Sequence, residues 1–282
     1  MSVGTILERT SVRRFENRSP GDAVLGRLGT IIAEESAPGP FGFTPRFRLV
    51  SADAMSPTER LGTYGVIRGA PAFVVGAALP TVGAWVDFAY RMEGIILGAT
   101  AMGLGTCWLG GTFSRSAASS LLQLRDDEVI PAVTPLGFRG HRAHIVGDVV
   151  KLVARSSTRR AFEQLFFDGS FDNPLSADRA AEFGTVLECV RRAPSARNLQ
   201  PWRIILERRA SSDRLHLYLA GESVFDIDSR SRNMHHLDMG IAMRHVAESA
   251  AALGIVGRWS RATVPIRPAG GSSMAYVAAW AG

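Results

Sequence analysis

The feature that most constrains the fold of this chain is an internal repeat with a spacing of about 150 residues. Four distinctive residues of the first half, Asp87, Met92, Gly103 and Trp108, recur 151 positions later as Asp238, Met243, Gly254 and Trp259. Earlier in the repeat, Ala37, Pro38 and Pro45 recur 156 positions later as Ala193, Pro194 and Pro201. Loop insertions produce such changes of offset. The repeat therefore predicts two copies of one unit, as in a dimer fused in tandem.

Hydrophobic periodicity and turn residues predict the same order of helices and strands in both copies. Helices are expected over residues 3–8, 22–35, 82–102, 116–124, 177–192 and 235–253, with a further helix start at Ser56. Strands are expected over residues 46–50, 72–78, 106–109, 129–138, 202–207, 214–220, 255–259 and 274–280. The fold class is therefore α+β, with one copy over residues 1–165 and the other over 166–282. The helices at 82–102 and 235–253 are expected to form a pseudo-two-fold interface.

The amino-acid composition limits the kinds of ligand and macromolecule that the chain is expected to bind. The chain carries a net charge of +6 and 46% apolar residues, which favours a sizeable core and anionic ligands. Its arginines are scattered and Lys151 is its only lysine, so a dedicated nucleic-acid surface is not expected. Charged residues come too early in the first fourteen residues for a secretory signal, so a cytoplasmic location is expected, with Cys107 and Cys189 as buried free thiols.

One stretch, residues 94–114, has no charged side chain and is about as long as a membrane span. Glycines interrupt it, and Gly103 and Gly105 mark the end of a helix and the start of a strand. We therefore expect a buried core helix that leads into a buried strand, and no membrane association.

Residues 193–202 form the most specific motif. Pro194 and Pro201 exclude a regular helix, and Ser195, Asn198 and Gln200 are expected to project as polar hooks that suit a planar, polar ligand. The stretch resembles the S-x-x-N-x-Q-P-W loop of the FMN-dependent nitroreductase family, which wraps the flavin mononucleotide (FMN) held by the other protomer. The resemblance covers nearly the whole chain and is closest to the duplicated, single-chain branch. It implies a three-layer α/β/α fold, and it implies FMN contacts from Pro194, Ser195, Ala196, Asn198 and Gln200.

A second motif, Arg9-x-Ser11-x-Arg13, lies near the N-terminus. Guanidinium groups bind phosphate in a bidentate way, but an isolated pattern of this kind is also common on solvated surfaces. Beside the 193–202 loop it resembles the family's clamp for the FMN phosphate. The resemblance also implies a later basic residue at this phosphate, for which Arg159 and Arg160 are candidates. Arg155, Ser157 and Arg159 could equally be the second copy of the clamp.

Two weaker motifs complete the candidate site. Trp108-Leu109-Gly110-Gly111 follows a strand, and two glycines permit close approach of a ligand to the backbone. By resemblance, Leu109, Gly110 and Gly111 would lie at the N5 edge of the flavin, although an ordinary strand-to-helix turn fits equally well. Tyr64 would lie beside the pyrimidine or ribityl chain, although a structural turn is the simpler interpretation.

The sequence contains no motif for a metal site or for the other common catalytic and nucleotide-binding sites. His141-x-x-His144 and His235-His236 have no acidic or cysteine partner at metal-ligand spacing, so no metal is expected. The chain also has no nucleophile elbow, P-loop or C-x-x-C motif.

The resemblance implies one FMN per chain, because only the second loop carries the motif. The first loop has Gly39, Gly42, Thr44 and Arg46 where the second has Ser195, Asn198, Gln200 and Trp202. The implied activity is hydride uptake from NAD(P)H and reduction of a nitroaromatic, a quinone or a similar small acceptor, by a monomer that acts as a pseudo-dimer. Two alternatives remain: an FMN storage protein whose substrate face is covered by residues 37–44 or 166–174, and a flavin-free interaction protein.

Overall fold

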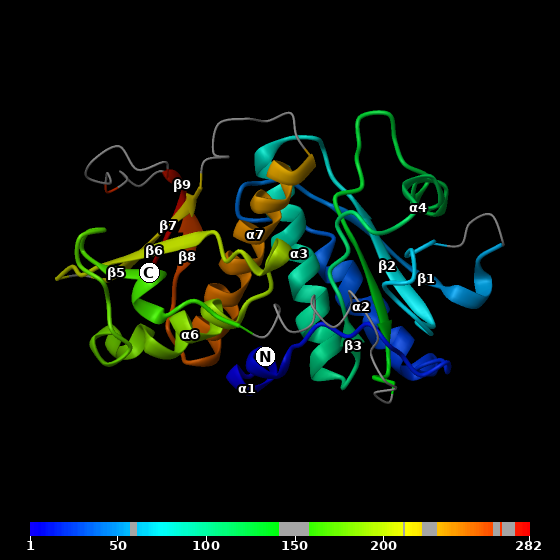
Figure 1. The fold of residues 1–282 in the computed structure, drawn as a ribbon, viewed down its shortest axis with the longest axis horizontal. Coiled ribbons are helices and arrows are strands. Elements are labelled where there is room, and N and C mark those ends of the chain that lie inside the picture. Colours follow the sequence, from blue (N-terminus) through cyan, green and yellow to red (C-terminus); the bar gives the residue numbers. More distant parts are fainter. Residues whose placement is uncertain (57–60, 141–157, 211, 222–229, 262–265, 267–273) are drawn as a thin grey trace. The chain divides into compact units, whose positions relative to one another are not determined.

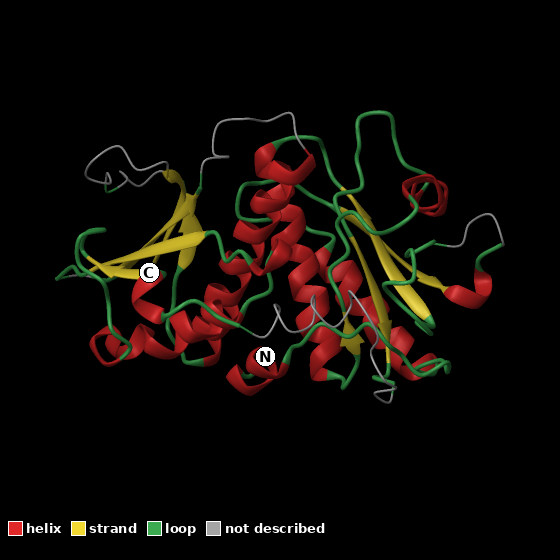
Figure 2. Cartoon of the chain, in the orientation of Figure 1, coloured by secondary structure: helices red, strands yellow, loops and turns green. Residues whose placement is uncertain are grey.

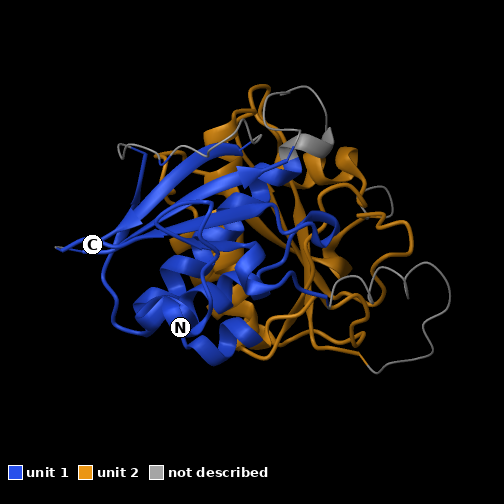
Figure 3. Cartoon of the chain, turned by 60° about the vertical axis from the view of Figure 1, so that its left-hand side comes forward, with its two compact units in different colours: residues 1–7, 155–282 blue, residues 8–154 orange. Residues whose placement is uncertain are grey.

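A computed structural model describes the chain except for residues 57–60, 141–157, 211, 222–229, 262–265 and 267–273. The chain divides into two compact units, and Figure 3 colours them separately. Unit 2 contains residues 8–154, and unit 1 contains residues 1–7 together with 155–282. Each unit has one sheet and one long helix of its own (Figure 1).

Unit 2 is built on a four-stranded antiparallel sheet with the order β1-β2-β4-β3. The strands are β1 (Arg46–Ser51), β2 (Ala72–Ala77), β3 (Gly105–Thr106) and β4 (Val133–Gly137). Its helices are α2 (Asp22–Glu35), α3 (Val82–Ala101) and α4 (Arg115–Leu122), with a short 3-10 turn at Ala52–Ala54. Helices α2 and α3 lie on one side of the sheet and α4 lies on the other (Figure 2). Unit 2 is therefore a three-layer structure.

The side chains of β2 explain these layers, because neighbouring residues of a strand point to opposite faces. Phe73, Val75 and Ala77 belong to the apolar cluster that includes residues of α4. Gly76 faces the other way, and a Cβ at this position would lie 2.7 Å from the ring of Phe88 on α3. Both faces of β2 are buried, which matches its continuous apolar sequence.

Unit 1 is built on a five-stranded sheet with the order β5-β6-β7-β9-β8. The strands are β5 (Phe166–Asp168), β6 (Trp202–Glu207), β7 (Arg214–Ala220), β8 (Arg258–Ser260) and β9 (Met274–Ala281). The β5–β6 pair is parallel, and the β6–β7, β7–β9 and β8–β9 pairs are antiparallel. Its helices are α1 (Val3–Glu8), α6 (Gly184–Arg192) and α7 (Arg230–Ala252), with 3-10 turns at Phe162–Gln164, Asp178–Phe183 and Ala196–Asn198. Helix α7 contacts α6 and β6, so it covers the sheet as α3 does in unit 2.

Most of the expected elements are confirmed, and the differences have local causes. The expected helix over 177–192 is broken, because Ala181 has a φ of 50°. The strand expected over 106–109 is reduced to β3, and Leu109 forms only an isolated bridge to Val133. The helix expected from His235 begins at Arg230. The helix start expected at residues 56–59 lies mostly outside the described residues.

The segment 166–174, a candidate cover in the sequence, contains strand β5. Phe166 is fully buried and its strand pairs with β6, so this part of the segment belongs to the sheet. Stretch 94–114 contains the end of α3 and strand β3, as expected. None of the helices in the described part of the chain is long and apolar enough to span a membrane.

Candidate flavin site

The Arg9-x-Ser11-x-Arg13 segment lies alongside β3 in unit 2. Ser11 forms a parallel bridge with Thr106, and the backbone N–H of Val12 donates to the carbonyl of Thr106 over 2.7 Å. Gly105 makes this approach possible, because a Cβ there would lie 2.7 Å from the side chain of Val12. The pairing brings the arginine motif beside the strand that leads to Leu109, Gly110 and Gly111. Two stretches predicted to bind the same ligand therefore meet within one unit.

Arg9 is a buried cation with a distant counter-charge. Its side chain is 4% exposed, and its Nε lies 3.9 Å from Oε1 of the fully buried Glu93. Burial lowers the pKa of Arg9, and Glu93 opposes this shift. Within the described residues, the Nε atoms of Arg9 and Arg13 have no hydrogen-bond partner. Such donors fit an anionic group such as a phosphate, which accepts several charge-assisted hydrogen bonds.

Cys107 belongs to the same cluster, which the sequence did not reveal. Its thiol is hydrogen-bonded to Ser11 and lies in the field of Arg13 and Arg9. Burial raises the pKa of Cys107 more than these three groups lower it. The thiol therefore stays neutral and adds no negative charge beside the two arginines.

The turn after β3 is held in place from both sides. Leu109 exchanges two backbone hydrogen bonds with Val133, of 2.9 and 3.0 Å. Arg115 donates to the carbonyls of Gly110 over 3.1 Å and Ile130 over 2.6 Å. A Cβ at Gly111 would have no atom within 4 Å, so the backbone at this position is open to a ligand. The side chain of Leu109 is buried, so a ligand at this turn could contact only the backbone of Leu109.

Tyr64 is placed differently from these residues. Its side chain is 78% exposed, and its φ is 50° in a turn closed by the hydrogen bond from Val66 N–H to the Thr63 carbonyl. This geometry is that of an exposed structural turn, which was the simpler of the two interpretations.

The 193–202 loop lies in unit 1 between α6 and β6. Pro194 precedes an extended Ser195, and a single 3-10 turn follows at Ala196–Asn198. Ser195 Oγ accepts the backbone N–H of Gln200 over 2.9 Å. Arg197, Asn198 and Gln200 all have positive φ angles, which are unfavourable for residues other than glycine. The loop therefore has a strained backbone that is closed by its own side chains.

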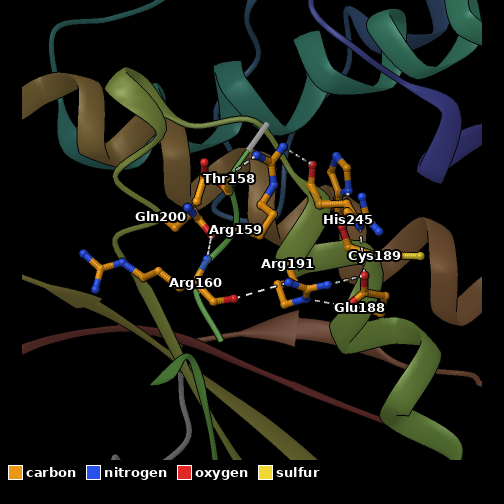
Figure 4. A network of polar contacts seen from close by, with 9 residues as sticks. Thr158, Arg159, Arg160, Glu188, Cys189, Arg191, Gln200 and His245 are labelled. Carbon is orange, nitrogen blue, oxygen red and sulfur yellow. Dashed lines mark hydrogen bonds and ion pairs between the residues drawn. The ribbon is translucent and has the colours of Figure 1, made fainter. Parts of the chain in front are cut away.

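The amide side chains of this loop bind the segment before β5. Asn198 Oδ1 accepts from Arg159 over 3.1 Å, and its Nδ2 donates to the carbonyl of Thr158 over 2.6 Å. Gln200 Oε1 accepts the backbone N–H of Arg160 over 3.0 Å (Figure 4). Gln200 is only 3% exposed, so it is not the projecting hook that the sequence suggested. Its role within the described structure is to fix the shape of the loop.

Arg159 and Arg160 are thereby placed with the loop of unit 1. Arg159 also donates to the carbonyl of Arg192 over 3.1 Å, and Arg160 donates to that of Leu199 over 3.2 Å. The carbonyl of Arg160 accepts from Arg191, which is paired with Glu188 (Figure 4). Arg155 and Ser157, the rest of the possible second clamp, lie outside the described residues.

Two repeated aspartates hold the two loops, and sequence reasoning assigned them no role. Asp238 on α7 accepts the backbone N–H of Ala196 over 2.8 Å. Asp87 on α3 accepts the backbone N–H groups of Phe41 and Phe43 over 2.8 to 3.1 Å. The signal for this role was present in the repeat, since both Asp87 and Asp238 and the two loops recur at nearly the same offset.

The family model described as "Putative TM nitroreductase" matches residues 3–250 of the chain. The chain belongs to this nitroreductase family. A solved "putative nitroreductase" of Thermotoga maritima is 17% identical, with a TM-score of 0.60, and the match covers all of this chain and 93% of that one. The α+β nitroreductase-like fold expected from the sequence is thus confirmed.

Other nitroreductase structures match about half of this nitroreductase-family chain. An FMN-bound nitroreductase of Desulfitobacterium hafniense is 22% identical with a TM-score of 0.38, and the match covers 54% of this chain and 97% of that one. A nitroreductase family protein of Clostridium novyi is 24% identical with a TM-score of 0.40, and the match covers 50% and 86% of the two chains. No curated protein matches the sequence.

Proposed function

We propose that this nitroreductase-family protein binds FMN and uses it to transfer electrons from NAD(P)H to a small acceptor such as a nitroaromatic or a quinone. The observation that carries the proposal is the buried Arg9 and the half-buried Arg13 beside the Gly110-Gly111 turn, whose buried Nε atoms have no partner among the described residues. A buried guanidinium N–H group without a hydrogen-bond partner is costly, and a phosphate dianion would offset that cost. Family membership supplies the choice of flavin among phosphorylated ligands.

The residues of unit 2 would divide the binding work. Arg9, Arg13 and the hydroxyl of Ser11 would hold the phosphate. The backbone at Gly110 and Gly111 would lie against the flavin ring, since no Cβ blocks the approach. Bound FMN would supply the two-electron chemistry, and the protein would position it and exclude water.

We further propose that residues 194–200 of unit 1 contact FMN, and that each chain binds one FMN. The converse loop in unit 2 lacks the motif, and its geometry opposes one. A Cβ at Gly39 would lie 2.4 Å from Cγ of Asp87, so a serine equivalent to Ser195 does not fit there. This difference supports a single site.

We also propose that the two units are diverged copies of one ancestral unit. Equivalent positions perform equivalent roles: Asp87 and Asp238 each accept loop amides, and Trp108 and Trp259 each donate an indole N–H to the long helix of their own unit. The acceptors are the Glu93 carboxylate in one unit and the Met243 carbonyl in the other.

The deciding experiment is the visible spectrum of the purified protein with added FMN, before and after anaerobic addition of NADPH or NADH. We expect one FMN per chain and loss of the flavin colour on addition of the nucleotide. Binding without bleaching would identify an FMN storage protein. A protein that ignores FMN would refute the proposal.

A variant pair tests the arginine clamp. Replacing Arg13 by Met should raise the Kd for FMN about tenfold or more, because charge-assisted hydrogen bonds to the phosphate are lost. The matched control is Arg18→Met, since Arg18 is exposed and paired with Glu16. Equal affinities in the two variants would remove Arg13 from the site.

A further inference from the structure

The loop of residues 195–200 has a backbone that its sequence does not favour. Arg197, Asn198 and Gln200 have φ angles of 51°, 56° and 50°, in the left-handed region that side chains other than glycine rarely adopt. Three such residues among four positions persist only where surrounding contacts fix the conformation.

Asp238 makes such a contact. It lies on α7 and is 2% exposed, and its Oδ1 accepts the backbone N–H of Ala196 over 2.8 Å. Its Oδ2 lies 3.4 Å from Nδ1 of His235, one turn earlier on the same helix. Ala196 is the first residue of the 3-10 turn, immediately before the three left-handed positions. The carboxylate therefore anchors the strained turn to the longest helix of unit 1.

Ser195 and Gln200 make further contacts of this loop, and these contacts do not involve α7. Ser195 closes the loop on Gln200, and the side chain of Gln200 holds the segment of Arg160. Neither interaction joins the loop to α7. Within the part of the chain that the structure describes, the hydrogen bond of Asp238 joins this helix to the loop, and the contacts of Ser195 and Gln200 do not replace it.

The equivalent residue in unit 2 offers an internal comparison. Asp87 accepts the N–H groups of Phe41 and Phe43, so the same position of the repeat tethers a loop there as well. That loop lacks the serine, asparagine and glutamine of the motif, and among its described residues only Gly42 has a positive φ. Both units therefore have a hydrogen bond from a helix carboxylate to the loop, whereas the strained backbone occurs in the loop that we assign to the cofactor.

We infer that Asp238 is a positioning residue for FMN, which holds residues 195–200 in the conformation that binds the cofactor by accepting the N–H of Ala196. The inference rests on the proposed function. It predicts that FMN affinity depends on a hydrogen-bond acceptor at position 238 and not on its charge.

Three variants test the inference, with the Kd for FMN measured by quenching of flavin fluorescence. Asp238→Ala removes the acceptor and should raise the Kd about tenfold or more. Asp238→Asn keeps an acceptor oxygen for Ala196 and should stay within about threefold of the wild type. Asp87→Ala is the matched control, which should leave the Kd for FMN unchanged.

A second experiment removes the donor of this hydrogen bond, the N–H of Ala196, and leaves its acceptor, Asp238, in place. Ser195 is extended and Ala196 begins a helical turn, which is a position where proline fits. Ala196→Pro should therefore weaken FMN binding as much as Asp238→Ala does. The double variant should be no weaker than either single variant, because the two changes remove the same hydrogen bond. This route remains decisive if Asp238→Ala does not fold.

Limited proteolysis gives a readout that needs no flavin. Arg197 is exposed, so trypsin should cut after it faster in Asp238→Ala than in the wild type, and at the wild-type rate in Asp238→Asn and Asp87→Ala. If Asp238→Ala is cut faster but the wild type binds no FMN, the proposed function is wrong, whereas the role of Asp238 in fixing the loop is supported. Unchanged FMN affinity in both Asp238→Ala and Ala196→Pro, or an Asp238→Asn variant as weak as Asp238→Ala, would overturn the inference itself.

Discussion

The indole Nε1 of Trp108 donates a hydrogen bond of 2.7 Å to Oε2 of Glu93, inside unit 2 and next to the arginine motif. Glu93 is fully buried, and the other oxygen of its carboxylate lies 3.9 Å from Nε of Arg9. The tryptophan thus stabilises the carboxylate that balances the buried arginine. This links a residue of the β3 turn to the charge of the proposed phosphate site.

Replacement of Trp108 by Phe should destabilise the fold. Phenylalanine keeps an aromatic ring, although a smaller one than the indole, and the buried carboxylate loses a donor, which costs about 1 to 3 kcal/mol in the free energy of unfolding. Chemical denaturation monitored by circular dichroism measures the change. In the background of Glu93→Gln the same substitution should cost clearly less, because the acceptor is no longer charged. Equal costs in both backgrounds would show that the hydrogen bond contributes little.

The stability of unit 2 should depend on pH through Asp87. Burial raises the pKa of this carboxyl group to about 6, against the opposing effect of the Phe41 and Phe43 N–H groups and of Arg91. The folded state therefore holds the proton more tightly than the unfolded state. This contribution is full below about pH 4 and is lost as the pH rises through 6.

Comparison with Asp87→Asn isolates this effect. The stability of the wild type relative to the variant should fall by about 1 to 2 kcal/mol between pH 4 and pH 7.5. Urea denaturation at several pH values measures the difference. Asp126→Asn, a change at an exposed aspartate, serves as the control and should show no such trend. A difference between wild type and Asp87→Asn that is independent of pH would contradict the prediction.

Gly39 should tolerate no side chain. A Cβ at this position would lie 2.4 Å from Cγ of Asp87, so Gly39→Ala should destabilise the protein by about 1 to 3 kcal/mol through overpacking. Gly29→Ala is the control, since a Cβ there has open space and lies within α2, where alanine is favoured. Thermal melts of both variants test this. In an Asp87→Gly background, which also removes the Asp87 Cβ that lies 2.5 Å from the added carbon, the cost of Gly39→Ala should largely disappear, and a persistent cost would place the clash elsewhere.

Both cysteines should be unreactive in the folded protein. Cys107 is 3% exposed and Cys189 is fully buried, and burial raises the pKa of both thiols, that of Cys189 to about 11. The thiolate is the reactive form, so a disulfide reagent at pH 8 should modify neither residue until the protein is unfolded in guanidinium chloride. Two thiols should then react. Rapid reaction of either cysteine in the native protein would argue against the burial seen here.

Local patterns predicted much of the fold. Helix α2 has the bounds that its periodicity indicated, and β6 and β7 follow their apolar runs. Strand β5 was missed, because three residues carry no periodic signal and the strand exists only through its pairing with β6. The start of α7 at Arg230 was missed for a related reason, since its first turns are polar.

The candidate site divides in the same way. The motifs at Arg9 and Ser195 were visible in the sequence, because their residue types are distinctive. The roles of individual side chains were not, because they depend on partners far along the chain. Gln200 binds the backbone of Arg160, 40 residues earlier, and Asp87 excludes a side chain at Gly39, 48 residues earlier.

The first seven residues of the chain belong to unit 1, although residues 8–154 that follow them form unit 2. The polypeptide therefore enters unit 2 after starting in unit 1 and returns to unit 1 at about residue 155. A gene divided at codon 155 would separate residues 1–7, which contain most of helix α1, from the rest of unit 1. Separate production of unit 1 accordingly calls for a gene in which the segment encoding residues 1–7 is joined by a linker to the segment encoding residues 155–282.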